Sequence, residues 1–167
     1  MRYSLLNYRM NIMLHTNEPA NQFYVYLSAY RSYESQEVNE KMTKGLISEV
    51  RKYPGMYGVI EHDSVQGCYK EAGAESASIE RTIKVRCRSE YERDHLTYLA
   101  CRVYNQDCVL VVNSQTHTAS FANIEMVGEY PLSHPEVRAM QAGTFIQQDT
   151  GSEYYSVIDG VRWEVQA

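Results

Sequence analysis

The hydrophobic period of this chain changes repeatedly along its length, and that change constrains the fold more than any other feature. A period of two indicates a strand and a period near 3.6 indicates a helix. The pattern predicts a strand at 23–30 and a helix at 37–53 that Pro54-Gly55 ends. On that helix the residues expected to be buried are Val38, Met42, Leu46, Val50 and Tyr53. The further elements predicted are strands 57–65 and 68–72 around a turn at 64–67, a loop at 73–79, strand 82–88, a helix beginning at Ser89, strand 108–112, an edge strand at 116–121, a short helix at 136–141, and a hairpin of 154–158 and 161–165.

Two local signals fix element ends. Ser89 with Glu92 three residues later forms a capping-box pattern, in which each residue satisfies a backbone N–H of the other. Asp159-Gly160 between two alternating runs predicts a type I′ hairpin turn, because both residues tolerate positive φ angles.

The order strand, helix, strand, strand, helix, strand predicts an α/β sandwich of ferredoxin-like, split βαβ type. The expected domain is a four-stranded antiparallel sheet with two helices plus the C-terminal hairpin, over residues 23–167, with an extension from about 120 and an N-terminal arm at 1–22. Right-handed crossovers place both helices on one face. The other face would carry Tyr24, Tyr26 and Tyr30. We therefore expect it to be covered by another subunit or by the extension from about residue 120, which we call the tail.

Charge and cysteine usage exclude several classes of protein. The formal net charge is −5 without a basic run, which argues against a nucleic-acid partner. No stretch approaches the roughly 20 apolar residues that a membrane-spanning helix needs. The cysteines are Cys68, Cys87, Cys101 and Cys108, and no two form a C-x-x-C pair. We therefore expect a cytoplasmic protein with reduced thiols.

Standard catalytic motifs are missing from the sequence. It contains no Gly-rich phosphate loop, no G-x-S-x-G and no H-E-x-x-H pattern. A metal site at Glu61-His62-Asp63 stays an alternative to a solvated turn, but no metal or cofactor is expected. His117, after a buried strand, is either functional or an edge-strand residue. The carboxylates Glu61, Glu71, Glu80 and Asp107 would favour a cationic ligand.

Several runs of residues carry a resemblance to known proteins. They are Glu18-Pro-Ala-Asn21, Phe23-Tyr-Val25 with Ser28-Ala29 and Arg31, Pro54-Gly55 with Tyr57-Gly58, Gly67-Cys-Tyr69 with Glu71-Ala72, Val85-Arg-Cys87, Leu99-Ala-Cys101, Gln106-Asp-Cys-Val-Leu-Val111, Ser114-Gln-Thr-His-Thr-Ala119 and Arg162-Trp163. Together these runs resemble one family, the S-adenosylmethionine-degrading enzymes of T-odd bacteriophages, long called hydrolases and better described as lyases. The resemblance extends from about Met13 to about Thr118, resumes at the final hairpin, and is silent from Ser120 to Ser152. Residues 1–12 are an extension, and Met13 could be the true start.

The resemblance implies an activity and an assembly. S-adenosylmethionine would be converted to 5′-methylthioadenosine and L-homoserine lactone, which depletes the methyl donor of host restriction–modification systems. The family fold is PII-like, assembled as a homotrimer with active sites between subunits. The substrate holds its own nucleophile, the methionine carboxylate, and its own leaving group, so the protein needs no catalytic nucleophile. Positioning can then supply roughly 7–11 kcal/mol of the barrier.

The predicted site residues lie in the matching runs, except for Glu80. Glu71 is the first candidate for the central carboxylate, holding the substrate α-ammonium, and Glu80 is the second. Tyr57 and Tyr69 would cover the adenine or the sulfonium, the latter by cation–π contact. The remaining candidates bind polar substrate groups and are Gln106, Asp107 and Ser28.

The residues also allow a second function, binding without catalysis. PII-like trimers also act as binders without chemistry, so the chain could sequester S-adenosylmethionine or a host enzyme that makes it. A methyltransferase is a weaker alternative, because it usually needs a Gly-rich loop on a doubly wound sheet.

Overall fold

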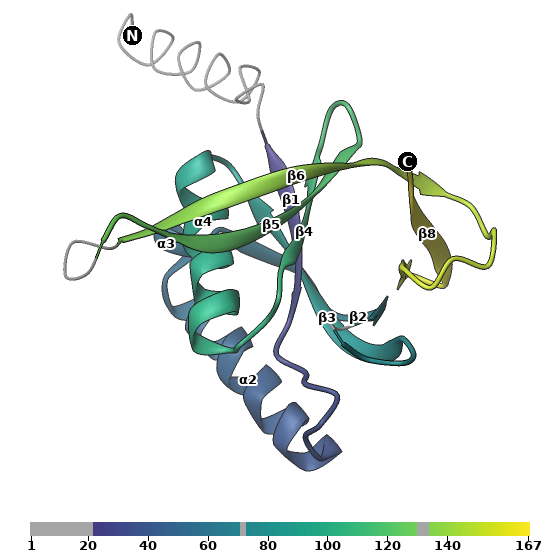
Figure 1. Ribbon diagram of the computed structural model, residues 1–167, viewed down its shortest axis with the longest axis horizontal. Helices are drawn as coiled ribbons and strands as arrows, with labels where there is room; N and C mark the ends of the chain where they lie inside the picture. The colour runs from purple at the N-terminus through teal and green to yellow at the C-terminus, as the bar shows by residue number, and fades with distance from the viewer. Residues whose placement is uncertain (1–21, 71–72, 130–133) are drawn as a thin grey trace, which may run out of the picture.

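The computed structural model describes residues 22–70, 73–129 and 134–167 (Figure 1). The predicted arm therefore lies outside the described residues except for Gln22. The elements are β1 (Phe23–Ser28), α2 (Gln36–Lys52), α3 (Pro54–Tyr57), β2 (Val59–Tyr69), β3 (Ser78–Cys87), α4 (Glu90–Tyr98), the π-helical turn η1 (Leu99–Val103), β4 (Val109–Asn113), β5 (Thr118–Val127), β6 (His134–Gln147), β7 (Tyr155–Ile158) and β8 (Val161–Gln166).

Eight strands close into one antiparallel barrel in the order β1-β3-β2-β7-β8-β6-β5-β4. The predicted fold class, a ferredoxin-like, PII-like sheet of four strands with two helices, is therefore wrong. The four strands of that prediction are neighbours here, β4-β1-β3-β2, but β2 and β4 are not sheet edges. An edge strand exposes unpaired backbone N–H and C=O groups. The tail satisfies them, because β7 pairs with β2 and β5 pairs with β4.

The tail is built almost wholly of strands. The helix expected at 136–141 is wrong, since β6 runs through it. This strand pairs with β5 from His134 to Thr144 and with β8 from Thr144 to Gln147. Gly143 lies where β6 leaves β5, at φ 145°, and a Cβ there would be 1.9 Å from the carbonyl oxygen of Gln166. Only glycine allows this close approach of two backbones. The segment predicted as an edge strand at 116–121 contains the first residues of β5, and β5 is paired on both sides rather than being an edge.

Of the other local predictions, some are wrong and some are confirmed. The turn expected at 64–67 is wrong, because β2 continues through it with register shifts near His62. The hairpin at Asp159-Gly160 is confirmed, with φ angles of 51° and 77°. The Ser89 cap is confirmed too, since its hydroxyl accepts a hydrogen bond from the Glu92 N–H at 3.3 Å.

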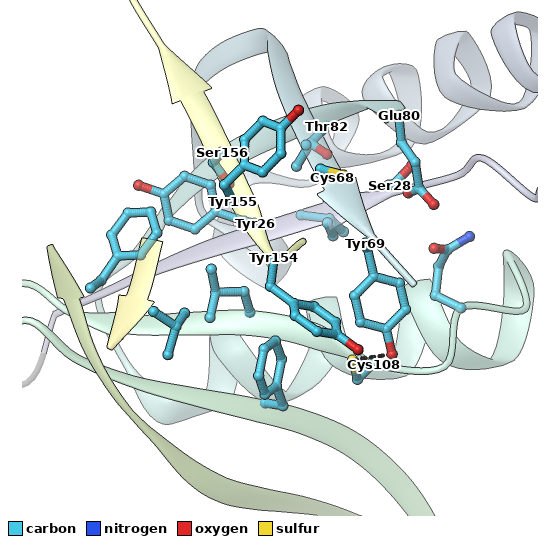
Figure 2. Close-up of a pocket in the computed structure, with 17 residues that line it drawn as sticks. Tyr26, Ser28, Cys68, Tyr69, Glu80, Thr82, Cys108, Tyr154, Tyr155 and Ser156 are labelled. Atoms are coloured by element: carbon cyan, nitrogen blue, oxygen red, sulfur yellow. Dashed lines mark hydrogen bonds between the residues drawn. The ribbon is translucent and has the colours of Figure 1, made fainter. Parts of the chain in front are cut away.

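The tyrosine-bearing face of β1 is covered by the tail. Tyr26 is 6% exposed, and its ring centroid lies 5.3 Å from that of Phe145 in β6. Trp163 of β8 also stacks on Phe145, with centroids 5.5 Å apart. Figure 2 shows Tyr26 facing the space between β1 and the tail strands. The tail thus converts an open sheet face into the inside of a barrel.

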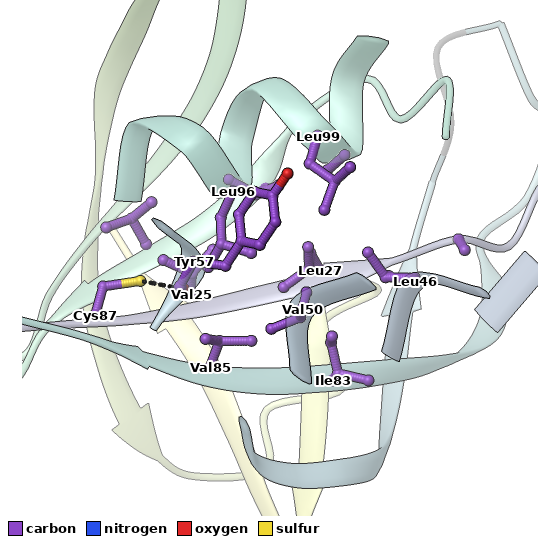
Figure 3. Close-up of a cluster of buried hydrophobic side chains, with 14 of the residues drawn as sticks. Val25, Leu27, Leu46, Val50, Tyr57, Ile83, Val85, Cys87, Leu96 and Leu99 are labelled. Atoms are coloured by element: carbon purple, nitrogen blue, oxygen red, sulfur yellow. Dashed lines mark hydrogen bonds between the residues drawn. The ribbon is translucent and has the colours of Figure 1, made fainter. Parts of the chain in front are cut away.

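The opposite face of the same strands packs against the helices (Figure 3). Val25 and Leu27 of β1 meet Leu46 and Val50 of α2, with Leu96 of α4 in the same cluster. All five of these side chains are at most 2% exposed. This close-packed aliphatic layer holds the strands that supply the pocket described below.

The buried face of α2 differs from the predicted one. Val38, Met42 and Tyr53 are exposed, while Asn39 and Thr43 are buried. Burying a polar group costs free energy unless it is hydrogen-bonded. Asn39 meets that condition, because its side chain bonds the N–H and the C=O of Arg31, and the Thr43 hydroxyl donates to the Asn39 carbonyl. The helix is therefore rotated toward the loop that follows β1. No helix among the described residues is long and apolar enough to cross a membrane.

Candidate functional site

A pocket opens inside the barrel, between β1, β2, β3 and the tail. About 620 Å³ of space between its lining residues is free of protein atoms, and part of this space is open to solvent. Its walls are mainly aromatic and aliphatic, with a few hydroxyl, amide and thiol groups. The lining residues are Tyr26, Leu27, Ser28, Gly67, Cys68, Tyr69, Glu80, Thr82, Gln106, Cys108, Leu110, Phe121, Phe145, Tyr154, Tyr155, Ser156 and Val165.

Glu80 is the one carboxylate among these described lining residues, which include no histidine, lysine or arginine. It is 6% exposed, and one of its oxygens accepts a hydrogen bond from the Ser78 hydroxyl at 3.3 Å. Strand alternation explains its direction, because Ile83 and Val85 of β3 face the helices while Glu80 and Thr82 face the barrel. The pocket therefore favours a positive ligand.

Glycine keeps space open beside this carboxylate. Gly67 of β2 pairs directly with Glu80 of β3. A Cβ at Gly67 would lie 2.4 Å from the Thr82 hydroxyl oxygen, so a side chain would displace part of the pocket wall. Glu80 also borders a wider polar cleft on its other side, which includes Glu40 and Arg81. The carboxylate thus stands between an aromatic pocket and a charged cleft.

Two tyrosines and a thiol lie together in the pocket wall (Figure 2) and also line a neighbouring hollow; we call this junction the pocket mouth. The rings of Tyr69 and Tyr154 meet edge to face, with centroids 5.8 Å apart. The Cys108 thiol donates to the Tyr69 hydroxyl oxygen at 3.4 Å. Burial raises the pKa of Tyr69 and also the pKa values of the Cys68 and Cys108 thiols. These groups stay protonated at neutral pH and present aromatic area and hydrogen-bond donors rather than anions.

The polar candidates Ser28 and Gln106 line the pocket and also tie down the loop after β1. Ser28 Oγ accepts from the Tyr30 N–H at 2.9 Å and donates to the Arg81 carbonyl at 3.1 Å. The Gln106 amide nitrogen donates to the Tyr30 carbonyl at 3.0 Å. Asp107 lies next to the pocket, in a hollow shared with Tyr69 and Tyr154, 3.6 Å from Arg31.

The structure brings only some of the predicted site residues together. Glu80, Tyr69, Ser28 and Gln106 share the pocket, and Asp107 lies outside its lining. Tyr57 does not reach the pocket, because it is 8% exposed within the helix-side core. The adenine- or sulfonium-covering role predicted for Tyr57 is therefore not supported by its position. Glu71, the first candidate for the central carboxylate, lies outside the described residues.

The pocket residues of the tail could not be recognised from the sequence. Phe145, Tyr154, Tyr155 and Ser156 were not predicted as site residues, although all line the pocket. The Asp159-Gly160 signal located the hairpin that carries Tyr155 and Ser156, but periodicity does not indicate which other strand a hairpin joins. That pairing is long-range, between β7 and β2.

The alternative metal residues have separate partners. His62 Nε2 lies 3.8 Å from Asp159, Asp63 lies 3.2 Å from Arg51, and Glu61 pairs with Lys84 at 3.2 Å. No group of three or more potential metal ligands gathers anywhere in the described part of the chain. His117 lies in a turn at φ 58°, and its carbonyl accepts from the Phe145 N–H, so its backbone supports the tail.

Comparison with known proteins gives a single consistent result. The model of the S-adenosylmethionine lyase family matches residues 25–166, which include the tail. The S-adenosylmethionine lyase of Enterobacteria phage T3 is 37% identical over 158 residues, covering 92% of this chain and 100% of the relative. The chain belongs to the S-adenosylmethionine lyase family.

Proposed function

We propose that this protein cleaves S-adenosylmethionine to 5′-methylthioadenosine and L-homoserine lactone. The observation that carries the proposal is the pocket itself, in which one buried carboxylate, Glu80, stands among tyrosine rings. Membership of the lyase family supports it. The substrate has a sulfonium, an α-ammonium and a carboxylate, so its net charge is positive and complements Glu80.

The proposed chemistry uses the substrate's own groups. A carboxylate oxygen attacks Cγ of the methionyl chain, the C–O bond of the lactone forms, and the Cγ–S bond breaks. The bonding electrons go to sulfur, which leaves as the neutral thioether of methylthioadenosine, and no proton is transferred. Charge is neutralised along this path, so a pocket with few water contacts favours it. Holding the chain folded converts binding into rate.

The residues then have positioning roles. Glu80 holds the α-ammonium and orients the methionyl chain. Tyr69 and Tyr154 face the sulfonium or the adenine, where a cation over a ring is worth roughly 0.5–2 kcal/mol. Ser28 and Gln106 shape the polar end. Glu71 stays a candidate second carboxylate on the same proposal, and Asp107 with Arg31 borders the mouth.

Solvent oxygen tests the mechanism directly. The reaction is run in H₂¹⁸O, and the homoserine products are analysed by mass spectrometry at short times. Intramolecular attack gives unlabelled lactone, and any later opening places the label in the carboxylate. Attack of water at Cγ would instead place ¹⁸O in the homoserine hydroxyl from the first turnover, and that result would overturn the lyase mechanism.

The alternative function is stoichiometric sequestration of S-adenosylmethionine, or of a host enzyme that makes it. Turnover number separates it from catalysis. At a molar ratio of about one enzyme to 1,000 substrate molecules, a lyase turns over repeatedly and consumes all the substrate. A binder stops at about one equivalent per site.

Consumption of the substrate in the host-cell cytoplasm would deplete the methyl donor of restriction–modification systems, and this is the biological role that we propose.

We also propose that the protein is a homotrimer in which neighbouring subunits border the sites. The hollow at the pocket mouth includes Arg138 and Met140, and Met140 is 73% exposed. An exposed methionine at the mouth of a site is consistent with a protein contact there. Light scattering at micromolar concentration should give a mass three times 19.3 kDa. A monomer would contradict this assembly.

A further inference from the structure

The segment between β6 and β7, residues 148–154, runs directly into the pocket wall. Its last residue, Tyr154, and the first residue of β7, Tyr155, both line the pocket (Figure 2). Because the backbone of this segment takes no part in the strand pairing of the barrel, its other contacts hold it in place. Its contacts therefore decide where the two rings lie.

Three side chains, Thr150, Arg162 and Glu164, anchor this segment to β8, and we call them the clasp. Glu164 is 1% exposed although it is charged. Its carboxylate accepts hydrogen bonds from the Thr150 hydroxyl at 2.7 Å, from the Thr150 N–H at 3.1 Å and from Arg162 Nε at 2.9 Å.

Arg162 extends the clasp to the pocket wall. Its guanidinium donates to the Ser152 carbonyl at 2.7 Å, and its Cζ lies 3.7 Å from the ring centroid of Tyr155. Asp149 lies 3.4 Å from the same guanidinium. The clasp thus contacts residues 149, 150, 152 and 155, on both sides of Tyr154.

An ion pair around one buried carboxylate, here that of Glu164, is weak evidence for stability. Desolvation of the charges offsets most of their attraction, and an apolar cluster of similar volume stabilises a fold as well. Directional hydrogen bonds define one geometry, which an apolar cluster does less sharply. The inner face of β8 is already apolar, with Trp163 against Phe145 and Val165 in the pocket wall.

We propose that the clasp is a positioning device that sets Tyr154 and Tyr155 against the substrate. The inference rests on the proposed function of the pocket and adds to it three residues that do not contact the reacting atoms. Its loss should weaken substrate binding while leaving the chemical step nearly unchanged, because the clasp shapes a wall that binds ground state and transition state alike.

Thr150 offers the sharpest test. It is exposed as a residue, so Thr150→Val should fold, yet it loses the hydroxyl that bonds Glu164. We expect KM for S-adenosylmethionine to rise about 5- to 20-fold, with kcat within about twofold. Thr150→Ser keeps the hydroxyl and should restore KM to near the wild-type value. Glu164→Gln should act in the same direction as Thr150→Val.

Thr116→Val is the matched control. It removes another exposed threonine hydroxyl, which donates to the Thr118 hydroxyl oxygen at 2.9 Å in a turn that does not line the pocket. Its KM should not change. Wild-type protein without turnover would remove the proposed function. Wild-type turnover with Thr150→Val unchanged, with Ser as impaired as Val, or with kcat rather than KM affected would overturn the clasp.

Discussion

The two sides of β1 and β3 show how one set of strands serves two purposes. Toward the helices they present Val25, Leu27, Ile83 and Val85, which pack closely against α2 and α4. Toward the barrel they present Tyr26, Ser28, Glu80 and Thr82, which border an open pocket. The helix side is aliphatic and filled, whereas the barrel side is aromatic, polar and partly empty.

This difference separates stability from function. Close packing on the helix side stabilises the fold, because filled space adds dispersion attraction and buries apolar surface. The barrel side tolerates an unfilled space and a buried carboxylate because the helix side holds the strands in place. Substitutions on the two sides should therefore affect different measurements.

The largest expected effect is on the helix side. Leu46 is fully buried, so Leu46→Ala should lower the free energy of unfolding by about 2–5 kcal/mol. Met42 on the same helix is 38% exposed, and Met42→Ala should change it by no more than about 0.5 kcal/mol. Urea denaturation measures both. Equal losses in the two variants would show that the helix-side core has been misplaced.

The next effect is on the barrel side and concerns Glu80. Glu80→Gln keeps the shape but loses the charge that holds the α-ammonium. Because a charge-assisted hydrogen bond is worth about 1.5–3 kcal/mol against about 1 for a neutral one, kcat/KM should fall roughly tenfold or somewhat more. Glu80→Ala should be worse. Turnover is compared at matched folded fraction across pH 5 to 9.

Equal, near-complete inactivity of the Gln and Ala variants would favour a general base over a positioning role, because an amide cannot accept a proton. Glu71→Gln is the parallel variant. Wild-type activity of both Glu80 variants together with loss in Glu71→Gln would move the central role to Glu71. Glu136→Gln is the control, because Glu136 lies in β6 but does not line the pocket.

Much of the helix side could be predicted from sequence, because its periodicity is local. The strand at Phe23, the helix ending before Pro54 and the cap at Ser89 follow from residues that are neighbours in the chain. The buried face of α2 could not, since Asn39 and Thr43 are buried by tertiary hydrogen bonds that no local pattern reports.

The barrel could not be predicted, because it depends on pairing between distant strands. The run around Glu136 has prolines and mixed polarity, and only the pairing of β6 with β5 and β8 makes it a strand. Four predicted site residues, Glu80, Tyr69, Ser28 and Gln106, lie together in the pocket. The tail residues opposite them were not predicted, because the pairing that brings them there is long-range.

The clasp carboxylate, Glu164, should make the free energy of unfolding depend on acid pH. Hydrogen bonds from Thr150 and from Arg162 hold the pKa of Glu164 below its ordinary value of 4.5. A carboxyl whose pKa is lower in the folded state stabilises the fold above the unfolded pKa. That contribution is lost as pH falls below 4.5 through the folded pKa. Unfolding free energy should therefore fall less steeply with acid in Glu164→Gln than in the wild type.

Part of the acid dependence should persist in that variant. The Tyr30 hydroxyl and Arg81 lower the pKa of Glu40, and this pair is untouched by the substitution. Urea midpoints from pH 7 to pH 3 measure both slopes. Parallel curves for wild type and Glu164→Gln would mean that Glu164 is not bonded in the folded protein as described here.

The smallest effect should come from the thiol that lines the pocket. A thiolate nucleophile needs a lowered pKa, whereas burial raises the pKa of Cys108 and keeps the thiol protonated at neutral pH. Cys108→Ser retains a donor for the Tyr69 hydroxyl oxygen, so kcat/KM should stay within about threefold of wild type. Cys101→Ser is the control, because burial raises its pKa to about 11 and it does not line the pocket. Near-complete loss of turnover in a folded Cys108→Ser protein, with Cys101→Ser active, would require a thiol step that the proposed mechanism lacks.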